Sequence, residues 1–346
     1  MKLYEKIKKS NKTFIIAEVS ANHKQRFSNI IKLVNQAVLA GVDAIKLQTY
    51  TSETITLKSN KKDFRILDKN NNLYKRNLYD VFSEAHTPWK WQKKVFSYAK
   101  KKGLVCFSSV FDETSVDFLS KIGVDAYKIS SFEINHHPLL KKVAREKKIV
   151  FLSTGMASIK EIQDAISILK KNGTTKIILL KCTSHYPADP KDVNLKTILE
   201  MKKKFKCIIG ISDHTVGTSV ALASVALGAK VIEKHFKLPN DKDSLDSHFS
   251  IDFKEMSYLV NQCKIVKTSI GSVVFGPTKK ELKNIKYRRS IYYSKDIKKG
   301  EKISLKNIKV VRPSLGLHPK YFNKILGKKI KKNVNYASRV KLTDLQ

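Results

Sequence analysis

Eight short apolar segments, each ending on reactive polar side chains, constrain the fold of this chain more than any other feature. They lie at 14–20 (FIIAEVS), 43–50 (DAIKLQTY), 105–111 (VCFSSVF), 126–133 (AYKISSFE), 149–156 (IVFLSTGM), 176–184 (KIILLKCTS), 207–214 (CIIGISDH) and 231–236 (VIEKHF). A β-branched run of this length, bounded by turn residues, predicts a buried strand. Segments with apolar residues at helical spacing, such as 159–169, separate these runs. The pattern predicts a (β/α)8 barrel of the TIM type.

The fold itself predicts where chemistry occurs, because catalytic groups of such barrels lie at the carboxyl ends of the strands. The polar residues that the sequence places there are Glu18, Lys46, Gln48, Ser109, Lys128, Glu133, Thr183, His214 and His235. A doubly wound open sheet of the same βα units is the alternative. A dinucleotide-binding domain of that kind requires a glycine-rich turn after its first strand. The chain reads AEVSANHKQ at this point, without glycine, which disfavours that alternative.

The length of the chain predicts a second, smaller domain. A single barrel of about 250 residues leaves roughly a hundred of the 346 residues over. From about Tyr287 the sequence changes to short β-like runs and tight turns. We expect a barrel domain at 1–270, a linker at 271–286 with Gly271, Gly276 and Pro277, and a β-rich domain at 287–346.

Cysteine usage and the amino terminus predict a cytoplasmic protein. The four cysteines have no CxxC spacing, and three of them lie inside predicted strands, so we interpret them as buried core residues. The first twenty residues contain no apolar stretch long enough for a signal peptide or a membrane span. We therefore expect neither export nor membrane insertion.

The formal net charge of +38 raises the hypothesis of nucleic-acid or polyanion binding. The lysines are, however, spread along the whole chain in surface-type runs such as 100–102 and 202–204. The chain also lacks the aromatic-plus-basic segments that stack bases. We interpret the charge as a solvated basic surface that attracts anionic substrates and predict no specific nucleic-acid partner.

Two histidines predict a metal site. His214 in ISDHT and His235 in EKHF end the seventh and eighth segments, so they lie on neighbouring strands at the same rim. Two converging imidazoles suit a divalent ion such as Mn²⁺, Zn²⁺ or Co²⁺ that keeps positions open for substrate. Asp213 and Glu233 are the expected hydrogen-bonding partners of these ligands. The alternative is that both histidines are structural.

Lysines inside strands predict an anion site. Alternation along DAIKLQTY places Lys46 in the barrel interior, with Ile45 and Leu47 toward the helices. An inward lysine needs an anion, so we expect Lys46 and Lys128 to hold a phosphate or carboxylate. The hydroxyls expected around that anion belong to Ser109, Ser131, Ser153 and Ser212. A lysine that forms a Schiff base, as in an aldolase, is the alternative, and Lys181 on the sixth segment is its first candidate.

Three carboxylates are candidates for a general base or a hydroxyl-binding group. Glu18 and Glu133 end strands, and Asp246 lies in a loop beyond one. Glutamates in such positions are also common helix caps and ion-pair partners, so a structural role stays open.

The motifs together resemble the sialic acid synthase family, and most closely its pseudaminic acid synthase branch. The matching segments, in order, are FIIAEVSANH, DAIKLQTYT, TPWKW, CFSS, YKISSFE, STG, LKCTSHYP, GISDHT, VIEKHF and, in the tail, VVRPSLGLHP. The match covers nearly the whole chain. Within the family, SANH, QTYT, SSFE and CTSxYP are typical of the pseudaminic branch, whereas the neuraminic branch typically has NHNG, QTF, PSGE and CNTEYP.

The resemblance implies a reaction. Members of the family join phosphoenolpyruvate to an open-chain amino sugar, release phosphate and form a nine-carbon 2-keto acid. The implied sugar is 2,4-diacetamido-2,4,6-trideoxy-L-altrose, and the implied product is pseudaminic acid. The resemblance also implies a divalent ion, Mn²⁺ or else Mg²⁺ or Co²⁺, on His214 and His235.

The resemblance implies residue roles as well. The residues implied to surround phosphoenolpyruvate are Lys46, Ser109, Lys128, Ser131, Ser153, Thr183 and Ser212. Those implied to face the sugar are Gln48, Glu133, Tyr186 and Asp246. The tail resembles the antifreeze-like (SAF) domain of these synthases, whose arginine, here Arg312, reaches the active site of the other subunit of a homodimer. A domain-swapped homodimer is therefore expected.

Two departures from the family pattern concern loops. Val110 occupies the place of a proline in the typical SSPF or STPF, and NHKQ replaces the glycine-containing NHxG. Neither change removes a charged ligand, but both alter loops that hold phosphate and sugar. The neuraminic and legionaminic branches, a lysine-dependent aldolase and a polyanion-binding protein therefore stay as alternatives.

Overall fold

Eight parallel strands close into a barrel, as the sequence predicts. In the computed structural model, which describes residues 3–68 and 73–346, the strands follow in order around the barrel, and β1 pairs with both β2 and β8. Their bounds are β1 Phe14–Glu18, β2 Ala44–Thr49, β3 Val105–Val110, β4 Ala126–Ile129, β5 Ile149–Ser153, β6 Ile177–Cys182, β7 Ile208–Asp213 and β8 Val231–His235. Each observed strand lies inside one predicted segment, and the predicted segments extend into the loop that follows.

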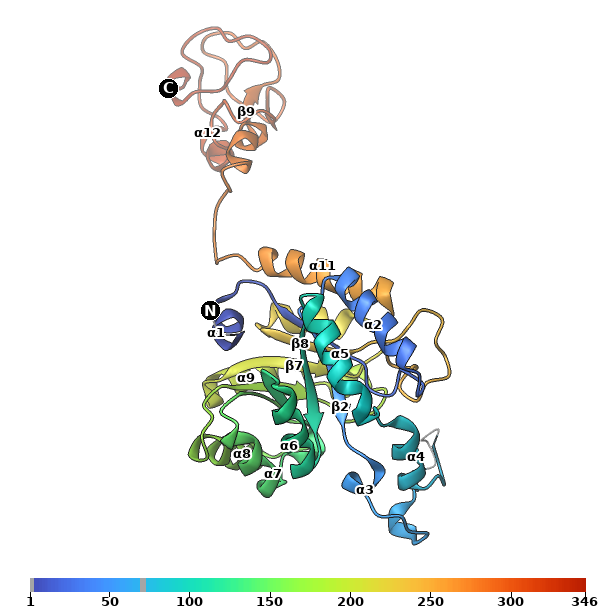
Figure 1. Ribbon diagram of the computed structural model, residues 1–346. Coiled ribbons are helices and arrows are strands. Elements are labelled where there is room, and N and C mark those ends of the chain that lie inside the picture. The colour runs from blue at the N-terminus through green and yellow to red at the C-terminus, as the bar shows by residue number, and fades with distance from the viewer. Residues whose placement is uncertain (1–2, 69–72) are drawn as a thin grey trace. The chain divides into compact units, whose positions relative to one another are not determined.

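Helices cover the outside of the barrel (Figure 1). Those of the barrel unit are α1 Leu3–Lys9, α2 Phe27–Ala40, α3 Ser52–Ile55, α4 Leu78–Ala85, α5 Trp89–Lys101, α6 Glu113–Ile122, α7 His137–Arg145, α8 Ile159–Lys171, α9 Thr197–Phe205, α10 Ser219–Ala226 and α11 Phe253–Ser269. Local sequence explains their ends. Ser158 and Glu161 form a capping box that begins α8, and Gly123 ends α6 in the left-handed conformation.

Alternation along the strands separates two cores. Outward residues such as Ile45 and Leu47 pack with the helices, and inward residues such as Ala44, Phe107 and Phe151 fill the amino-terminal half of the barrel. The rings of Phe107 and Phe151 stack with centroids 4.8 Å apart. Because the barrel is filled at this end, a ligand enters only from the carboxyl ends of the strands.

The chain divides into two units, Met1–Gly271 and Ser272–Gln346. In the second unit, β9 Ser290–Tyr293 pairs antiparallel with β10 Ile308–Val311. The short α-helix α12 Phe322–Ile325 follows, next to short 3-10 turns. A small core that includes Ile291, Tyr293 and Ile308 holds this unit together. The connecting segment is apolar and exposed, with Phe275 97% exposed.

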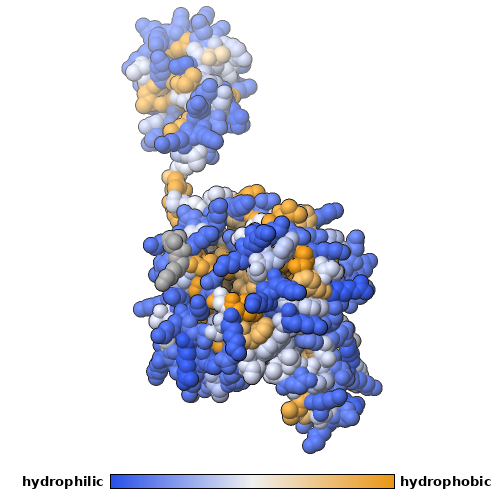
Figure 2. Space-filling view, in the orientation of Figure 1, coloured by the Kyte–Doolittle hydropathy of each residue, from blue (hydrophilic) through white to orange (hydrophobic). Residues whose placement is uncertain are grey.

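The visible surface of both units is mostly hydrophilic (Figure 2), in keeping with lysines spread over the whole chain. Within residues 3–68 and 73–346, no helix is both long and apolar enough to cross a membrane.

Candidate functional site

Polar side chains replace apolar ones on the inner face of the barrel as the strands approach their carboxyl ends. Glu18 lies two residues beyond Ile16, Lys46 two beyond Ala44, and Lys128 two beyond Ala126, and all three apolar residues belong to the inner core. The same alternation places Ser109, Ser153, Ser212 and Glu233 inside the barrel. All seven polar residues are buried. The predicted inward direction of Lys46 is confirmed.

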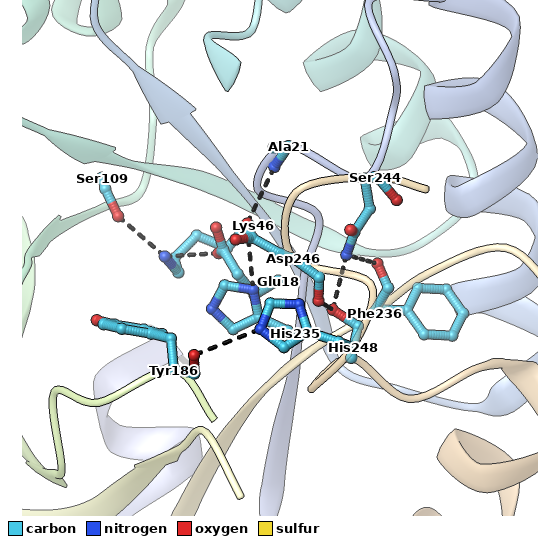
Figure 3. Close-up of polar contacts among 12 residues, drawn as sticks. Glu18, Ala21, Lys46, Ser109, Tyr186, His235, Phe236, Ser244, Asp246 and His248 are labelled. Atoms are coloured by element: carbon cyan, nitrogen blue, oxygen red, sulfur yellow. Dashed lines mark hydrogen bonds and ion pairs between the residues drawn. The ribbon is translucent and has the colours of Figure 1, made fainter. Parts of the chain in front are cut away.

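A buried cluster of two lysines and two glutamates occupies this level. The Lys46 ammonium lies 2.5 Å from a Glu18 carboxylate oxygen and donates to the Ser109 hydroxyl at 2.9 Å (Figure 3). Glu233 lies 3.7 Å from both Lys46 and Lys128 and accepts a hydrogen bond from Ser212 at 2.9 Å. Glu233 therefore joins the two lysines and does not support the histidines, which corrects one expectation from the sequence.

Burial and the neighbouring charges shift the pKa values of the residues in this cluster. Burial raises the pKa of Glu18 to about 7, and the charge of Glu233 adds to this effect although Lys46 opposes it. Burial also disfavours ionised Glu233, but Lys128 and Lys46 outweigh it and lower the pKa of Glu233. Burial and the charge of Lys46 lower the pKa of Lys128. An anion placed beside Lys128 would offset that desolvation.

Hydroxyl groups lie close to the backbone at Gly155, just beyond the end of β5. The amide of Gly155 donates to the Ser131 hydroxyl at 3.0 Å. A Cβ atom on Gly155 would lie 2.7 Å from that hydroxyl and 2.2 Å from the hydroxyl of Ser184, so a larger residue would have to displace these hydroxyls. The buried hydroxyl of Ser153 makes no hydrogen bond within the described part of the chain. Such an unpaired group is expected where a ligand supplies the partner.

The two histidines meet at the mouth of the barrel, with ring centroids 5.2 Å apart. His214 Nδ1 lies 3.0 Å from the carbonyl oxygen of Thr183, and a proton donated there leaves Nε2 free to bind a metal. His235 Nδ1 is buried and has no hydrogen-bond partner among the described residues. The ring of Phe249 packs against both imidazoles, at 4.7 Å from His235 and 6.0 Å from His214.

The electrostatics of the two imidazoles differ. Burial, together with the charge of His214, lowers the pKa of His235 well below its usual value. Burial opposes the charged form of His214 too, but Cys182 outweighs it and raises the pKa of that imidazole. The Cys182 sulfur lies 3.8 Å from His214 Nδ1. The interpretation of Cys182 from the sequence only as a core residue missed its place beside His214. Alternation along β6 could have indicated it, because Ile178 and Leu180 point into the barrel and Cys182 follows at the same spacing.

Asp213 is not a partner of the histidines, contrary to the expectation from the sequence. Its carboxylate lies 2.8 Å from the ammonium of Lys234 and accepts hydrogen bonds from the amide and hydroxyl of Thr215. Lys234 and Asp213 point away from the barrel interior, because their neighbours Glu233 and Ser212 point into it. This buried ion pair is structural.

Two of the four predicted sugar-facing residues, Tyr186 and Asp246, lie beside the histidines. The Tyr186 ring packs on His214 with centroids 4.4 Å apart. An Asp246 carboxylate oxygen lies 3.8 Å from His235 Nδ1 (Figure 3). Gln48 lies on the inner face of β2, in register with Ser109 of β3. Burial raises the pKa of Glu133 to about 7 although Lys128 opposes it, and Glu133 Oε2 has no hydrogen-bond partner within the described residues.

Two predicted residues of the barrel unit point their side chains away from the barrel interior. The Thr183 hydroxyl accepts from Lys181 at 2.7 Å, on the outward side of β6, so only the Thr183 carbonyl reaches the site. Lys181 shares its strand face with Ile177 and Leu179 of the outer core, which disfavours it as a Schiff-base lysine inside the barrel.

Arg312 follows β10 in the second unit, where it borders a cavity of about 270 Å³ with Tyr292 and Tyr336.

Comparison with known proteins identifies the family. Residues 33–275 match the NeuB family, and residues 288–345 match the SAF domain. The chain belongs to the NeuB family. The resemblance found in the sequence is thereby confirmed, and so is the fold that it implies, a barrel followed by a SAF domain.

Several relatives are named as synthases of sialic-type acids. Pseudaminic acid synthase of Campylobacter jejuni subsp. jejuni serotype O:2 is 43% identical over 335 residues, 97% of each chain. Pseudaminic acid synthase of Helicobacter pylori is 37% identical and covers 96% of this chain and 97% of its own. A crystal structure of N-acetylneuraminic acid synthetase from Leptospira borgpetersenii has a TM-score of 0.70 at 32% identity, covering 80% of this chain and 91% of its own. This NeuB chain is accordingly an enzyme of the sialic-type acid synthase class.

Proposed function

We propose that the enzyme condenses phosphoenolpyruvate with 2,4-diacetamido-2,4,6-trideoxy-L-altrose to form pseudaminic acid and phosphate. The observation that supports this most is the pairing, in one barrel mouth, of a buried lysine and hydroxyl cluster with two converging imidazoles. The cluster suits an anion, and the imidazoles suit a divalent ion beside it. The similarity to pseudaminic acid synthases supports the choice of sugar.

Phosphoenolpyruvate would occupy the lysine cluster. Its phosphate and carboxylate would pair with Lys46 and Lys128 and accept from the hydroxyls of Ser109, Ser131 and Ser153. The Ser212 hydroxyl, whose proton is donated to Glu233, would border the same anion. The unpaired Ser153 hydroxyl and the cramped Gly155 approach support this placement. The lysines would also stabilise the negative charge that develops on the phosphate as it leaves.

His214 and His235 fit a divalent ion such as Mn²⁺, Mg²⁺ or Co²⁺. The carbonyl oxygen of Thr183 orients the imidazole of His214. The imidazole of His235, whose pKa is lowered, has a buried Nδ1 without a hydrogen-bond partner in the described residues. When bound, the ion supplies Lewis-acid polarisation of the sugar's aldehyde oxygen. No cluster of three histidine, cysteine, aspartate or glutamate residues that could hold a metal exists in the described residues, so substrate and water would complete the coordination.

The remaining residues would orient the sugar and move protons. Gln48, Tyr186 and Asp246 would bind the sugar, holding its aldehyde carbon against the methylene of phosphoenolpyruvate. The new carbon–carbon bond forms between these two atoms, water adds to the phosphate-bearing carbon, and phosphate leaves. Glu133 would accept the proton of that water, since a carboxylate with a pKa of about 7 suits a base near neutral pH.

The sugar specificity is tested by comparing kcat/KM for two sugars. A pocket that hydrogen-bonds an acetamido group leaves its own polar groups unpaired when offered a hydroxyl, at a cost of about 1 to 3 kcal/mol for each buried group. We therefore expect the diacetamido-trideoxy-altrose to be used at least about tenfold more efficiently than N-acetylmannosamine, which corresponds to roughly 1.4 kcal/mol. Equal or reversed values would assign the chain to the neuraminic or legionaminic branch. The legionaminic alternative is relevant because an N,N'-diacetyllegionaminic acid synthase of Campylobacter jejuni is 37% identical to this chain.

We further propose that Arg312 completes the active site of a second subunit in a homodimer. Exposed apolar side chains follow the strands at the barrel mouth, among them Phe132 (59% exposed), Met156 (65%) and Val216 (68%). Such a rim favours a covering surface, and Arg312 beside the tyrosines of the second unit offers a cation for the substrates.

Subunit mixing tests the proposed dimer. Arg312→Ala and His235→Ala subunits should each be inactive, and their mixture should regain part of the activity. The reason is arithmetic, because some mixed dimers have one site with an intact barrel and an intact partner arginine. Phosphate release after mixing measures the rescue. Absence of rescue, with subunit exchange demonstrated by differently tagged chains, would show that Arg312 acts within its own subunit or not at all.

Finally, we propose that the enzyme works in the cytoplasm. Its cysteines at 106, 182, 207 and 263 are free thiols. Cys182 touches His214, so oxidation there would alter the site. A reducing compartment keeps such thiols intact.

A further inference from the structure

Asn22 is a fully buried amide that joins two loops at the barrel mouth. It lies in the loop between β1 and α2 and is 0% exposed. Its Nδ2 group donates to the carbonyl oxygen of Phe236 at 3.0 Å and to the hydroxyl of Ser250 at 2.8 Å. Phe236 directly follows His235, and Ser250 lies in the loop between β8 and α11. Both acceptors therefore belong to the segment that surrounds the candidate metal ligand.

The contacts continue from Asn22 to the carboxylate of Asp246. The Ser250 hydroxyl donates to the carbonyl oxygen of Asp246 at 2.6 Å. The amide of Ala21 lies 3.4 Å from Asp246 Oδ2, and the same oxygen lies 3.8 Å from His235 Nδ1 (Figure 3). Ala21 thus holds the carboxylate of Asp246 directly, and Asn22 holds the backbone carbonyl of Asp246 through Ser250.

Hydrogen-bond polarity explains why an amide stands at position 22. The Ser250 hydroxyl has one proton and uses it on Asp246, so it must accept from Asn22. The Phe236 carbonyl can only accept. Position 22 must therefore supply two N–H donors in one direction, which asparagine does. An aspartate has the same shape but no donor, and its charge would face the Phe236 carbonyl.

The ends of the β8–α11 loop are fixed independently of Asn22. Residue 237 donates its amide to the carbonyl of Ile251, and Ile251 donates to the carbonyl of His235, each at 3.0 Å. Loss of the Asn22 contacts would leave these ends paired. The loss of these hydrogen bonds would therefore loosen mainly the middle of the loop, where Asp246 lies.

We propose that Asn22 is a positioning residue that sets the carboxylate of Asp246 for the amino sugar beside His235. This inference rests on the proposed function for its substrate. The β1–α2 loop would then help to bind the amino sugar and not phosphoenolpyruvate. Phosphoenolpyruvate would be held by Lys46 and Lys128, through contacts that do not involve Asn22.

Asn22→Asp tests the inference by a split between the two substrates. We expect the KM for the amino sugar to rise roughly tenfold, the equivalent of about 1.4 kcal/mol, while the KM for phosphoenolpyruvate stays within about twofold. The matched control is Asn29→Asp. Asn29 lies in the first turn of α2 and donates at 3.1 Å to the carbonyl oxygen of His23, which belongs to the same β1–α2 loop as Asn22. Asn29→Asp should leave both constants unchanged. Equal changes in both constants for Asn22→Asp would overturn the inference.

A double-mutant cycle shows whether Asn22 acts through Asp246. If it does, Asn22→Asp should change the sugar KM little further in an Asp246→Asn background. Fully additive effects would indicate an independent structural role. If Asn22→Asp fails to fold, Ser250→Ala cuts the same chain of contacts one step later and should give the same split between substrates.

Amide hydrogen exchange measures the geometric part of the inference without any substrate. Exchange in residues 237–252 should accelerate in Asn22→Asp and stay unchanged in Asn29→Asp. Unchanged exchange in both would overturn the inference whatever the reaction is. If exchange accelerates in Asn22→Asp but the wild-type enzyme releases no phosphate, the proposed function is contradicted. The structural role of Asn22 in fixing the loop would still be supported.

Discussion

His235→Ala is expected to abolish synthesis, with a fall in kcat/KM of roughly a thousandfold or more. A Lewis acid supplies several kcal/mol of transition-state stabilisation, and about 4 kcal/mol corresponds to a factor of a thousand. Two neutral imidazoles form a weak, open site, so the loss of one should not be rescued by ordinary metal concentrations. Wild-type enzyme should lose activity with EDTA and regain it with Mn²⁺, Co²⁺ or Mg²⁺.

The metal-binding part of this prediction is measured directly by Mn²⁺ electron paramagnetic resonance. Bound Mn²⁺ should be present in wild type and absent in His235→Ala. His137→Ala is the matched control, because His137 is an exposed imidazole at the first residue of α7. It should bind Mn²⁺ as the wild type does. Full turnover of a verified metal-free sample would contradict the role proposed for His214 and His235.

Lys46→Ala should chiefly weaken phosphoenolpyruvate, raising its KM about 100-fold or more. Close to 3 kcal/mol of charge-assisted binding would be lost. Glu18 and Glu233 would also lose a cation at 2.5 and 3.7 Å, which leaves their charge to repel the incoming anion. The sugar KM should change far less. Steady-state kinetics with each substrate varied in turn give both constants.

A control separates anion binding from the loss of a buried ion pair. Lys234→Met breaks the ion pair between Lys234 of β8 and Asp213 of β7. This pair is as buried as that of Lys46 but points away from the barrel interior. It should lower the melting temperature without a selective rise in the KM for phosphoenolpyruvate. A Lys46 variant with unchanged phosphoenolpyruvate kinetics would place Lys46 outside the substrate site.

The barrel could be predicted from the sequence because its strands repeat a simple physical pattern. Buried parallel strands contain continuous apolar runs, such as residues 177–180 of β6, and alternation within 44–49 separates Lys46 from Ile45 and Leu47. The exact strand ends could not be predicted. Polar residues after each strand, such as Ser130 and Ser131 after β4, extend the apparent run although the backbone has already turned.

The site was predictable where strand position alone fixes a side chain, as for Lys46, Lys128, His214 and His235. The partners of these residues were not, because they depend on contacts across the barrel. Glu233 faces two lysines and not the neighbouring histidine, since its inward direction on β8 brings it to 3.7 Å from Lys46 of β2 and from Lys128 of β4. Asn22 and Phe249 lie in loops without periodicity, so only the folded chain reveals that they touch the site.

Phosphate release from phosphoenolpyruvate is the most direct test of the proposed reaction. The assay compares no sugar, N-acetylmannosamine and 2,4-diacetamido-2,4,6-trideoxy-L-altrose, each with and without EDTA. The account predicts phosphate released in equal amount to a nine-carbon 2-keto acid, only when both phosphoenolpyruvate and an amino sugar are present, and not in EDTA. No phosphate release with any amino sugar, or an imine trapped by borohydride in its place, would contradict the account.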